Sequence, residues 1–95
     1  DLIHASGNIE VTWFQLNPDT SIVGRTLAEA NLRAHTGASV VAIIRNKEML
    51  ANPKSMTVFE AGDRIGFIGD KGQLDKVEKL LLETGFKDFG VEQET

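Results

Sequence analysis

The chain lacks cysteine entirely, and its two histidines, His4 and His35, lie far apart in the sequence. The absence of cysteine excludes a disulfide framework, a thiol nucleophile and a zinc site of the cysteine type. No apolar run approaches the roughly 18 residues that a membrane-spanning helix requires. Neither a nucleophile elbow nor a phosphate-binding glycine loop is present. We therefore expect no enzymatic activity. His35 is expected to lie at the end of a helix and to face solvent or a partner.

The composition is that of an ordinary soluble domain. Of 95 residues, 41% are hydrophobic and 25% are charged, which suits one small domain with one core. Acidic residues number 14 and basic residues 10, so the formal net charge is −4. An acidic chain is a poor match for a phosphate backbone, and we expect no DNA or RNA partner.

Hydrophobic patterning indicates an α+β fold with a small mixed β-sheet. Strands are predicted at residues 9–16, 39–45, 49–51, 55–59 and 64–69. Within the first, Ile9, Val11 and Trp13 are expected on one face, with Phe14 and Leu16 on the other. The helical pattern at residues 26–36 lies between two strands, and a crossover there would make them parallel neighbours.

Two helix starts are marked by capping-box spacing. Thr26 with Glu29 predicts a short helix of two to three turns that ends at Gly37. Asp70 with Gln73 predicts a C-terminal amphipathic helix that ends at Gly85, and its apolar stripe comprises Leu74, Val77, Leu81 and Leu82. The predicted organisation is a linker over residues 1–8, a domain over residues 9–85 and a C-terminal tail over residues 86–95, in which Phe86, Phe89 and Val91 can dock.

The best candidate for ligand chemistry is Arg33 with Ser39. Arg33 offers a planar donor fork that suits phosphate, and Ser39 begins the buried strand six residues later. Leu27, Ala28, Val40 and Val41 supply apolar walls for a flat base. The alternative is that Arg33 forms a salt bridge or a contact at the end of its helix.

Three other groups of residues are weaker candidates for a functional site. Asp70, Asp75 and Glu78 are read as a helix cap and a solvated face rather than a metal site. Residues 62–63 and 69–72 are read as turns. Trp13 beside Phe14 is read as strand or dimer packing rather than as a platform for stacking a base.

At residues 21–33, 37–45 and 61–70 the sequence resembles the C-terminal regulatory domain of bacterial potassium-transport proteins, the TrkA-C or RCK_C family. The resemblance extends over about residues 9–83. It implies a small dimeric α+β module on the cytosolic side of potassium channels, potassium uptake systems and cation/proton antiporters. It also implies a sensor and not an enzyme.

Several members of this family bind cyclic di-AMP between two protomers. The resemblance implies a corresponding site in this chain. The positions that match the ligand-binding pattern are Leu27, Ala28, Asn31, Arg33, Ser39, Val40, Val41 and Pro53. Asn31 stands where the family has an aspartate, and Ser39 stands where it has an asparagine. Ala28 is smaller than the usual aliphatic residue.

Two functions follow from the resemblance. The first is a cytoplasmic homodimer that binds cyclic di-AMP or a related nucleotide and regulates a potassium or cation/proton transporter, either in the same chain or as a separate subunit. The alternative is a dimerisation and assembly module without a ligand. Neither requires a cofactor or a metal.

Overall fold

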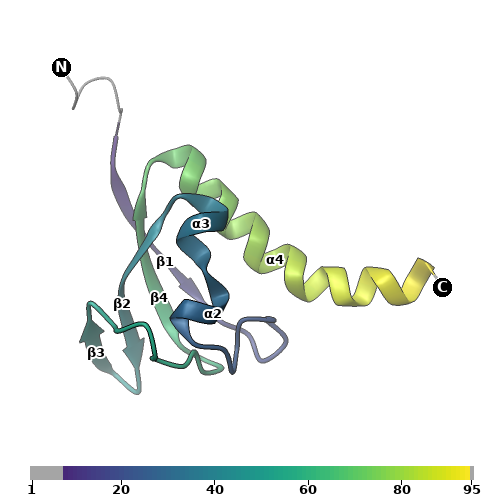
Figure 1. Cartoon of the computed structure of the whole chain (residues 1–95), viewed down its shortest axis with the longest axis horizontal. Helices are drawn as coiled ribbons and strands as arrows, with labels where there is room; N and C mark the ends of the chain where they lie inside the picture. The colour runs from purple at the N-terminus through teal and green to yellow at the C-terminus, as the bar shows by residue number, and fades with distance from the viewer. Residues whose placement is uncertain (1–7, 95) are drawn as a thin grey trace.

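The computed structural model describes the backbone of residues 8–94 and the side chains of residues 8–82. Its strands are β1 (Glu10–Gln15), β2 (Ser39–Arg45), β3 (Glu48–Ala51) and β4 (Arg64–Gly69), and its helices are α2 (Leu27–Ala30), α3 (Leu32–Thr36) and α4 (Lys71–Glu94) (Figure 1). The α+β class is confirmed, and the predicted bounds of β2 and β4 agree with the observed ones. The first seven residues, with His4 and most of the predicted linker, lie outside the described part.

The sheet has the strand order β1-β4-β2-β3. Each neighbouring pair is antiparallel, so the prediction of a mixed sheet is wrong. The crossover through α2 and α3 does make β1 and β2 run in the same direction. They are not neighbours, however, because β4 lies between them and pairs with both.

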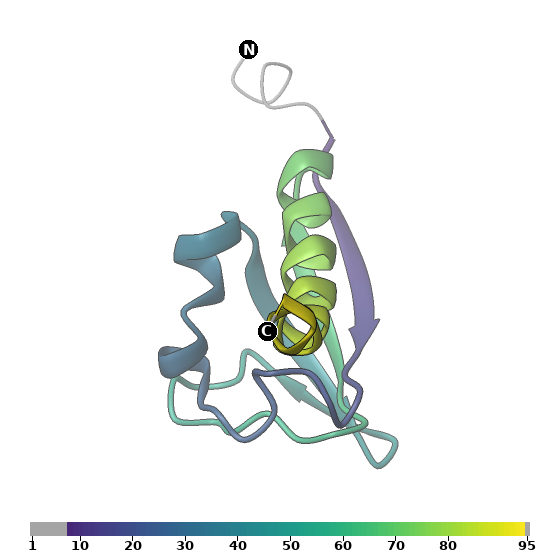
Figure 2. The same ribbon diagram turned by 90° about the vertical axis from the view of Figure 1, so that its right-hand side faces the viewer.

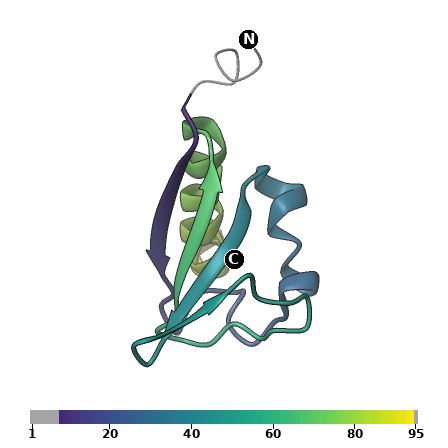
Figure 3. The same ribbon diagram turned by 90° about the vertical axis from the view of Figure 1, so that its left-hand side faces the viewer.

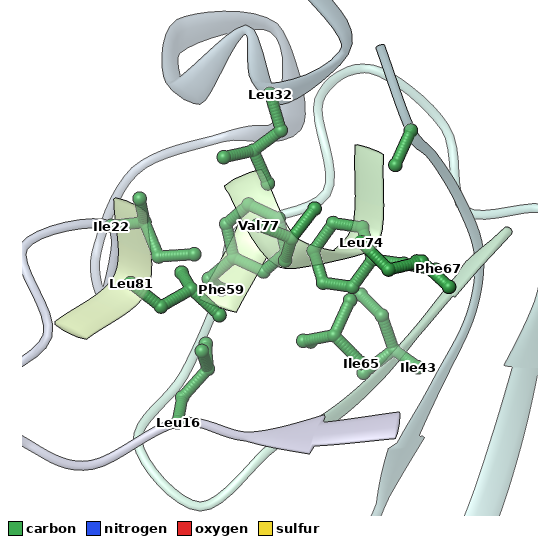
Figure 4. Packing of buried hydrophobic residues seen from close by; sticks show 11 residues of the cluster. Leu16, Ile22, Leu32, Ile43, Phe59, Ile65, Phe67, Leu74, Val77 and Leu81 are labelled. Carbon is green, nitrogen blue, oxygen red and sulfur yellow. The ribbon is translucent and has the colours of Figure 1, made fainter. Parts of the chain in front are cut away.

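All three helices lie on the same side of the sheet, as Figures 1 and 2 show, and α3 and α4 contact its strands. Between them and the strands lies one apolar core, where Phe59, Ile65 and Phe67 are fully buried (Figure 4). The ring of Phe14 meets that of Phe67 edge to face at 5.8 Å. Phe59 reaches the core from the irregular segment before β4. The strand predicted at residues 55–59 is reduced to a single bridge between Val58 and Thr26.

No described helix covers the opposite face of the sheet (Figure 3). Val11 is 48% exposed there and Trp13 is 36% exposed, which confirms the predicted division of faces along β1. The indole of Trp13 lies against the sheet at Gly66, where an added Cβ would stand only 3.0 Å from its ring. A side chain at position 66 would therefore displace Trp13.

The predicted single helix over residues 26–36 is two helices. Thr26 and Glu29 form the expected capping box at the start of α2, with bonds of 3.0 and 3.1 Å. Asn31 then adopts a left-handed conformation with φ of 50°, which separates α2 from α3. Asn tolerates this region better than most residues, so the break occurs at low conformational cost.

Helix α4 begins as predicted and ends later. The Asp70 carboxylate and the Gln73 side chain bond each other's backbone N–H groups. Leu74, Val77 and Leu81 are buried, whereas Leu82 is 63% exposed and is not part of the stripe. The backbone remains helical past Gly85 to Glu94, so the predicted end at Gly85 is wrong. A glycine weakens a helix by about 1 kcal/mol but does not by itself end one. The side chains of Phe86, Phe89 and Val91 lie outside the described set.

Candidate functional site

A cavity of about 250 Å³ lies between the α2–α3 pair and the first residues of β2. Its lining comprises Leu27, Asn31, Leu32, Arg33, Ser39 and Val40, and we call it the Arg33 cavity. Five of the eight residues carried over from the family pattern thus surround one space. Leu32, which the sequence reasoning did not include, joins them from the core side, where it is buried.

Local backbone geometry brings Arg33 and Ser39 to the same cavity. The left-handed turn at Asn31 starts α3, and Gly37, with φ of 84°, ends it and reverses the chain toward β2. Thr36 stabilises that reversal, because its hydroxyl donates to the Leu32 carbonyl at 2.8 Å and accepts from the Ala38 N–H at 3.0 Å. Arg33 and Ser39, which are six residues apart in the sequence, therefore line the same cavity.

The charge of the Arg33 cavity is positive. Arg33 supplies the single ionic side chain of the lining, and its other polar side chains are the amide of Asn31 and the hydroxyl of Ser39. Within residues 8–82, no carboxylate forms an ion pair with the Arg33 guanidinium. The salt bridge considered as an alternative for Arg33 is thus absent there. A guanidinium that has no ion-pair partner among the described residues, beside two neutral polar groups and three aliphatic side chains, suits an anionic group attached to an apolar one.

The other three predicted residues border the cavity without lining it. The Ala28 N–H donates to the Ser55 carbonyl at 3.0 Å, and the Val41 carbonyl accepts from the Asn52 N–H at 2.8 Å. Pro53 lies on the segment between these two bonds. This segment therefore links α2 to β2.

An ionic cluster lies where β2 ends and β4 begins, and the sequence reasoning missed it. The Arg45 Nε and Nη2 atoms donate to the two oxygens of Asp63 at 2.8 and 2.7 Å. The same Nη2 donates to the Val58 carbonyl at 2.8 Å, and the Glu60 N–H donates to Asp63 at 2.9 Å. The hydrogen bond with Asp63 is the main cause that raises the pKa of Arg45 above its usual value.

Residues 57–59 connect the ionic cluster to Leu27, which lines the cavity. Its acceptor Val58 is flanked by Thr57, whose carbonyl bonds the Leu27 N–H at 2.9 Å, and by Phe59, whose N–H bonds the Arg25 carbonyl at 2.9 Å. Sequence patterns indicate Asp63 only as a turn residue, because its partner Arg45 lies 18 residues away. No helical or strand periodicity in the sequence relates two residues that are so far apart.

Asp70 and Asp75 have local structural roles. Asp70 caps the helix, as predicted, and Asp75 lies 3.8 Å from Lys71 in an i,i+4 pair. Within the part of the chain described here, no helix is both long and apolar enough to cross a bilayer.

Comparison with known proteins places this geometry in a family. The model of the TrkA-C domain matches residues 11–82, which contain every residue of the Arg33 cavity. The K(+)/H(+) antiporter subunit KhtT of Bacillus subtilis is 31% identical over 74 residues, which are 77% of this chain and 45% of KhtT. "Probable potassium channel protein 2" of Methanocaldococcus jannaschii is 32% identical over 74 residues, which are 78% of this chain and 22% of that protein. The chain thus spans less than half the length of these relatives.

Among solved structures, the RCK_C domain dimer of S. agalactiae BusR in complex with c-di-AMP matches with a TM-score of 0.70 and 27% identity, over 75% of this chain and 93% of that one. BusR has also been solved with its busA-promotor DNA, and there the match covers 37% of the BusR chain. Domains of this family are regulatory and are not enzymes. The match to the family model over most of the chain, together with the shared fold, shows that the chain belongs to the TrkA-C (RCK_C) domain family.

Proposed function

We propose that this domain is a cytoplasmic sensor that binds cyclic di-AMP between two copies of itself and so regulates a potassium or cation/proton transporter. The observation that carries the proposal is the Arg33 cavity. The described residues bring Arg33, Ser39 and the aliphatic side chains of Leu27 and Val40 around one space without a competing carboxylate. The membrane part of the transporter lies in the same chain or in a separate subunit.

The size of the cavity supports a shared site. Pockets for ligands of drug-like size enclose roughly 300–1,000 Å³. One Arg33 cavity, at about 250 Å³, falls below that range, whereas two facing cavities fall within it. A two-fold symmetric dinucleotide presents one phosphate and one base to each protomer, so a two-fold dimer matches its symmetry. The BusR domain is a dimer in its c-di-AMP complex, which supports the same arrangement here.

The proposal assigns roles to five of the six lining residues. Arg33 binds a phosphate through its guanidinium, and Leu27 and Val40 contact the faces of the base. Ser39 offers one hydroxyl at the rim, with shorter reach than an asparagine amide. Asn31 keeps the turn and leaves Arg33 without the carboxylate that an aspartate would supply. Binding to two protomers favours one arrangement of the dimer, and that preference is what regulates the transporter.

Calorimetric titration of the 95-residue chain with cyclic di-AMP tests the proposal, with ATP, AMP and cyclic di-GMP as control ligands. We expect binding of one ligand per two chains. Arg33→Ala is expected to weaken binding by at least about 100-fold, because each dimer loses two charged hydrogen bonds worth roughly 1.5–3 kcal/mol each. Arg25→Ala is the matched control, since Arg25 is an exposed arginine outside the cavity lining. Equal binding by both variants would refute the assignment of the site.

A second candidate function is ligand-independent assembly. The open sheet face favours it, because Val11, Trp13 and Met49 expose apolar surface there. A folded dimer that gives no heat with any of the four nucleotides would support this function over the sensor.

A further inference from the structure

Among the described residues, strand β1 is an edge strand of the sheet and pairs only with β4. Its register pairs Glu10 with Gly69 and continues to Gln15 with Arg64. One residue further along, the Leu16 N–H donates to the Asp63 carbonyl at 2.8 Å. Hydrogen-bonded pairs alternate along an antiparallel ladder, so Phe14, Thr12 and Glu10 bond β4 with their backbones. The backbones of Val11, Trp13 and Gln15 therefore point away from the sheet.

This edge lacks the usual protection against another strand. Natural edge strands are shortened, or carry proline or lysine, to prevent pairing. The opposite edge, β3, follows that rule, since it has four residues and Pro53 comes two residues after it. Strand β1 has six residues and contains neither proline nor lysine.

A groove of about 340 Å³ runs beside this edge, between β1 and the first turns of α4. Its lining comprises Glu10, Thr12, Phe14, Lys71, Leu74, Asp75 and Glu78, and we call it the β1 groove. Lys71 is paired with Asp75. Glu10 and Glu78 have no basic partner within residues 8–82, so the groove carries an excess of two negative charges.

We infer that the edge of β1 and the β1 groove together bind an extended basic peptide segment, which adds a fifth strand to the sheet. Side chains of an added strand alternate between the two faces. Those on the α4 side would meet Glu10 and Glu78, and those on the other side would meet Val11 and Trp13. The geometry thus selects a segment in which basic and apolar residues alternate.

The charge also argues against a second copy at this edge. Two β1 strands paired around a two-fold axis would bring the acidic grooves of both copies together, and like charges oppose such pairing. A basic partner is available if the proposed function holds, on which this step rests. Cytoplasmic loops of membrane proteins carry an excess of lysine and arginine, so a loop of the regulated transporter has the required chemistry.

An eight-residue peptide of alternating valine and lysine, capped at both ends, is the probe. A peptide of alternating valine and glutamate is its control. Binding is followed by the fluorescence of Trp13, the single tryptophan of the chain, which lies on β1. We expect the lysine peptide to bind at least about tenfold more tightly than the glutamate peptide.

Hydrogen exchange locates the contact. The N–H groups of Val11, Trp13 and Gln15 are expected to gain protection, while those of Thr12 and Phe14 stay unchanged. Glu78→Lys is expected to weaken peptide binding about tenfold, and Glu48→Lys on β3, with the same change of charge, less than twofold. No binding of the lysine peptide at millimolar concentration, equal binding of the two peptides, or binding without protection at Val11, Trp13 and Gln15 would overturn the inference. Cyclic di-AMP titration of the same variants reports on the Arg33 cavity separately, so the two proposals fail independently.

Discussion

Removing the carboxylate of Asp63 is expected to destabilise the domain by about 3 kcal/mol. The side chain of Asp63 is 1% exposed and accepts three hydrogen bonds, two from Arg45 and one from the Glu60 N–H. Breaking a buried ion pair by deleting one partner costs roughly 3–5 kcal/mol, because the remaining charge stays poorly solvated. The side chain of Arg45 is 23% exposed and keeps its bond to the Val58 carbonyl, which places the loss at the lower end.

Urea unfolding of Asp63→Ala, followed by Trp13 fluorescence, measures this loss. Glu60→Ala is the matched control, since Glu60 contacts the same arginine at 3.1 Å but its side chain is 58% exposed. An exposed pair contributes about 0–1 kcal/mol, so the control is expected to unfold nearly as the wild type does. Losses of free energy that agree within about 0.5 kcal/mol for the two variants would refute the reasoning from burial.

Asp63→Ala is also expected to weaken the backbone hydrogen bond of Leu27, which lines the Arg33 cavity. Asp63 orients Arg45, which bonds the Val58 carbonyl, and the neighbouring Thr57 carbonyl accepts from the Leu27 N–H. Hydrogen exchange at the Leu27 N–H should therefore accelerate in Asp63→Ala by more than in Glu60→Ala. A Leu27 amide unaffected by Asp63→Ala would show that the cluster does not support the cavity wall.

Three further predictions concern residues at the ends of the helices. Thr26→Ala removes the capping box of α2 and should cost about 1 kcal/mol in urea unfolding, whereas Thr26→Ser should cost much less; equal losses would exclude the hydroxyl as the cause. Gly37→Ala should cost about 1–2 kcal/mol, because φ is 84° and the new Cβ would lie 2.8 Å from the Gln73 side chain, which also bonds Asp70. Gly72→Ala, at a helical glycine with no neighbour closer than 3.5 Å, should instead stabilise the domain by up to about 1 kcal/mol, and a loss there would contradict the argument.

The sequence by itself determined the elements that depend on neighbouring residues. A continuous apolar run predicted β2 and apolar alternation predicted β4, both with their observed bounds. Side chains three residues apart predicted the caps at Thr26 and Asp70. Chemistry alone was enough to propose four of the residues around the Arg33 cavity, Leu27, Arg33, Ser39 and Val40, and the family resemblance added Asn31. Arg33 and Ser39 could be paired from sequence, because only one short turn separates them.

Only the tertiary structure decided the features that depend on distant residues. The sheet is antiparallel because β4 lies between β1 and β2. This position of β4 buries Ile65 and Phe67 in the core under α4, and no local sequence pattern predicts it. The pairing of Arg45 with Asp63 joins two positions that look like ordinary surface and turn residues in the sequence. The free edge and the groove beside β1 exist only because strand order leaves β1 outermost. Local interactions select helices, strands and caps, whereas order, burial and charge proximity follow from packing the whole chain around one core.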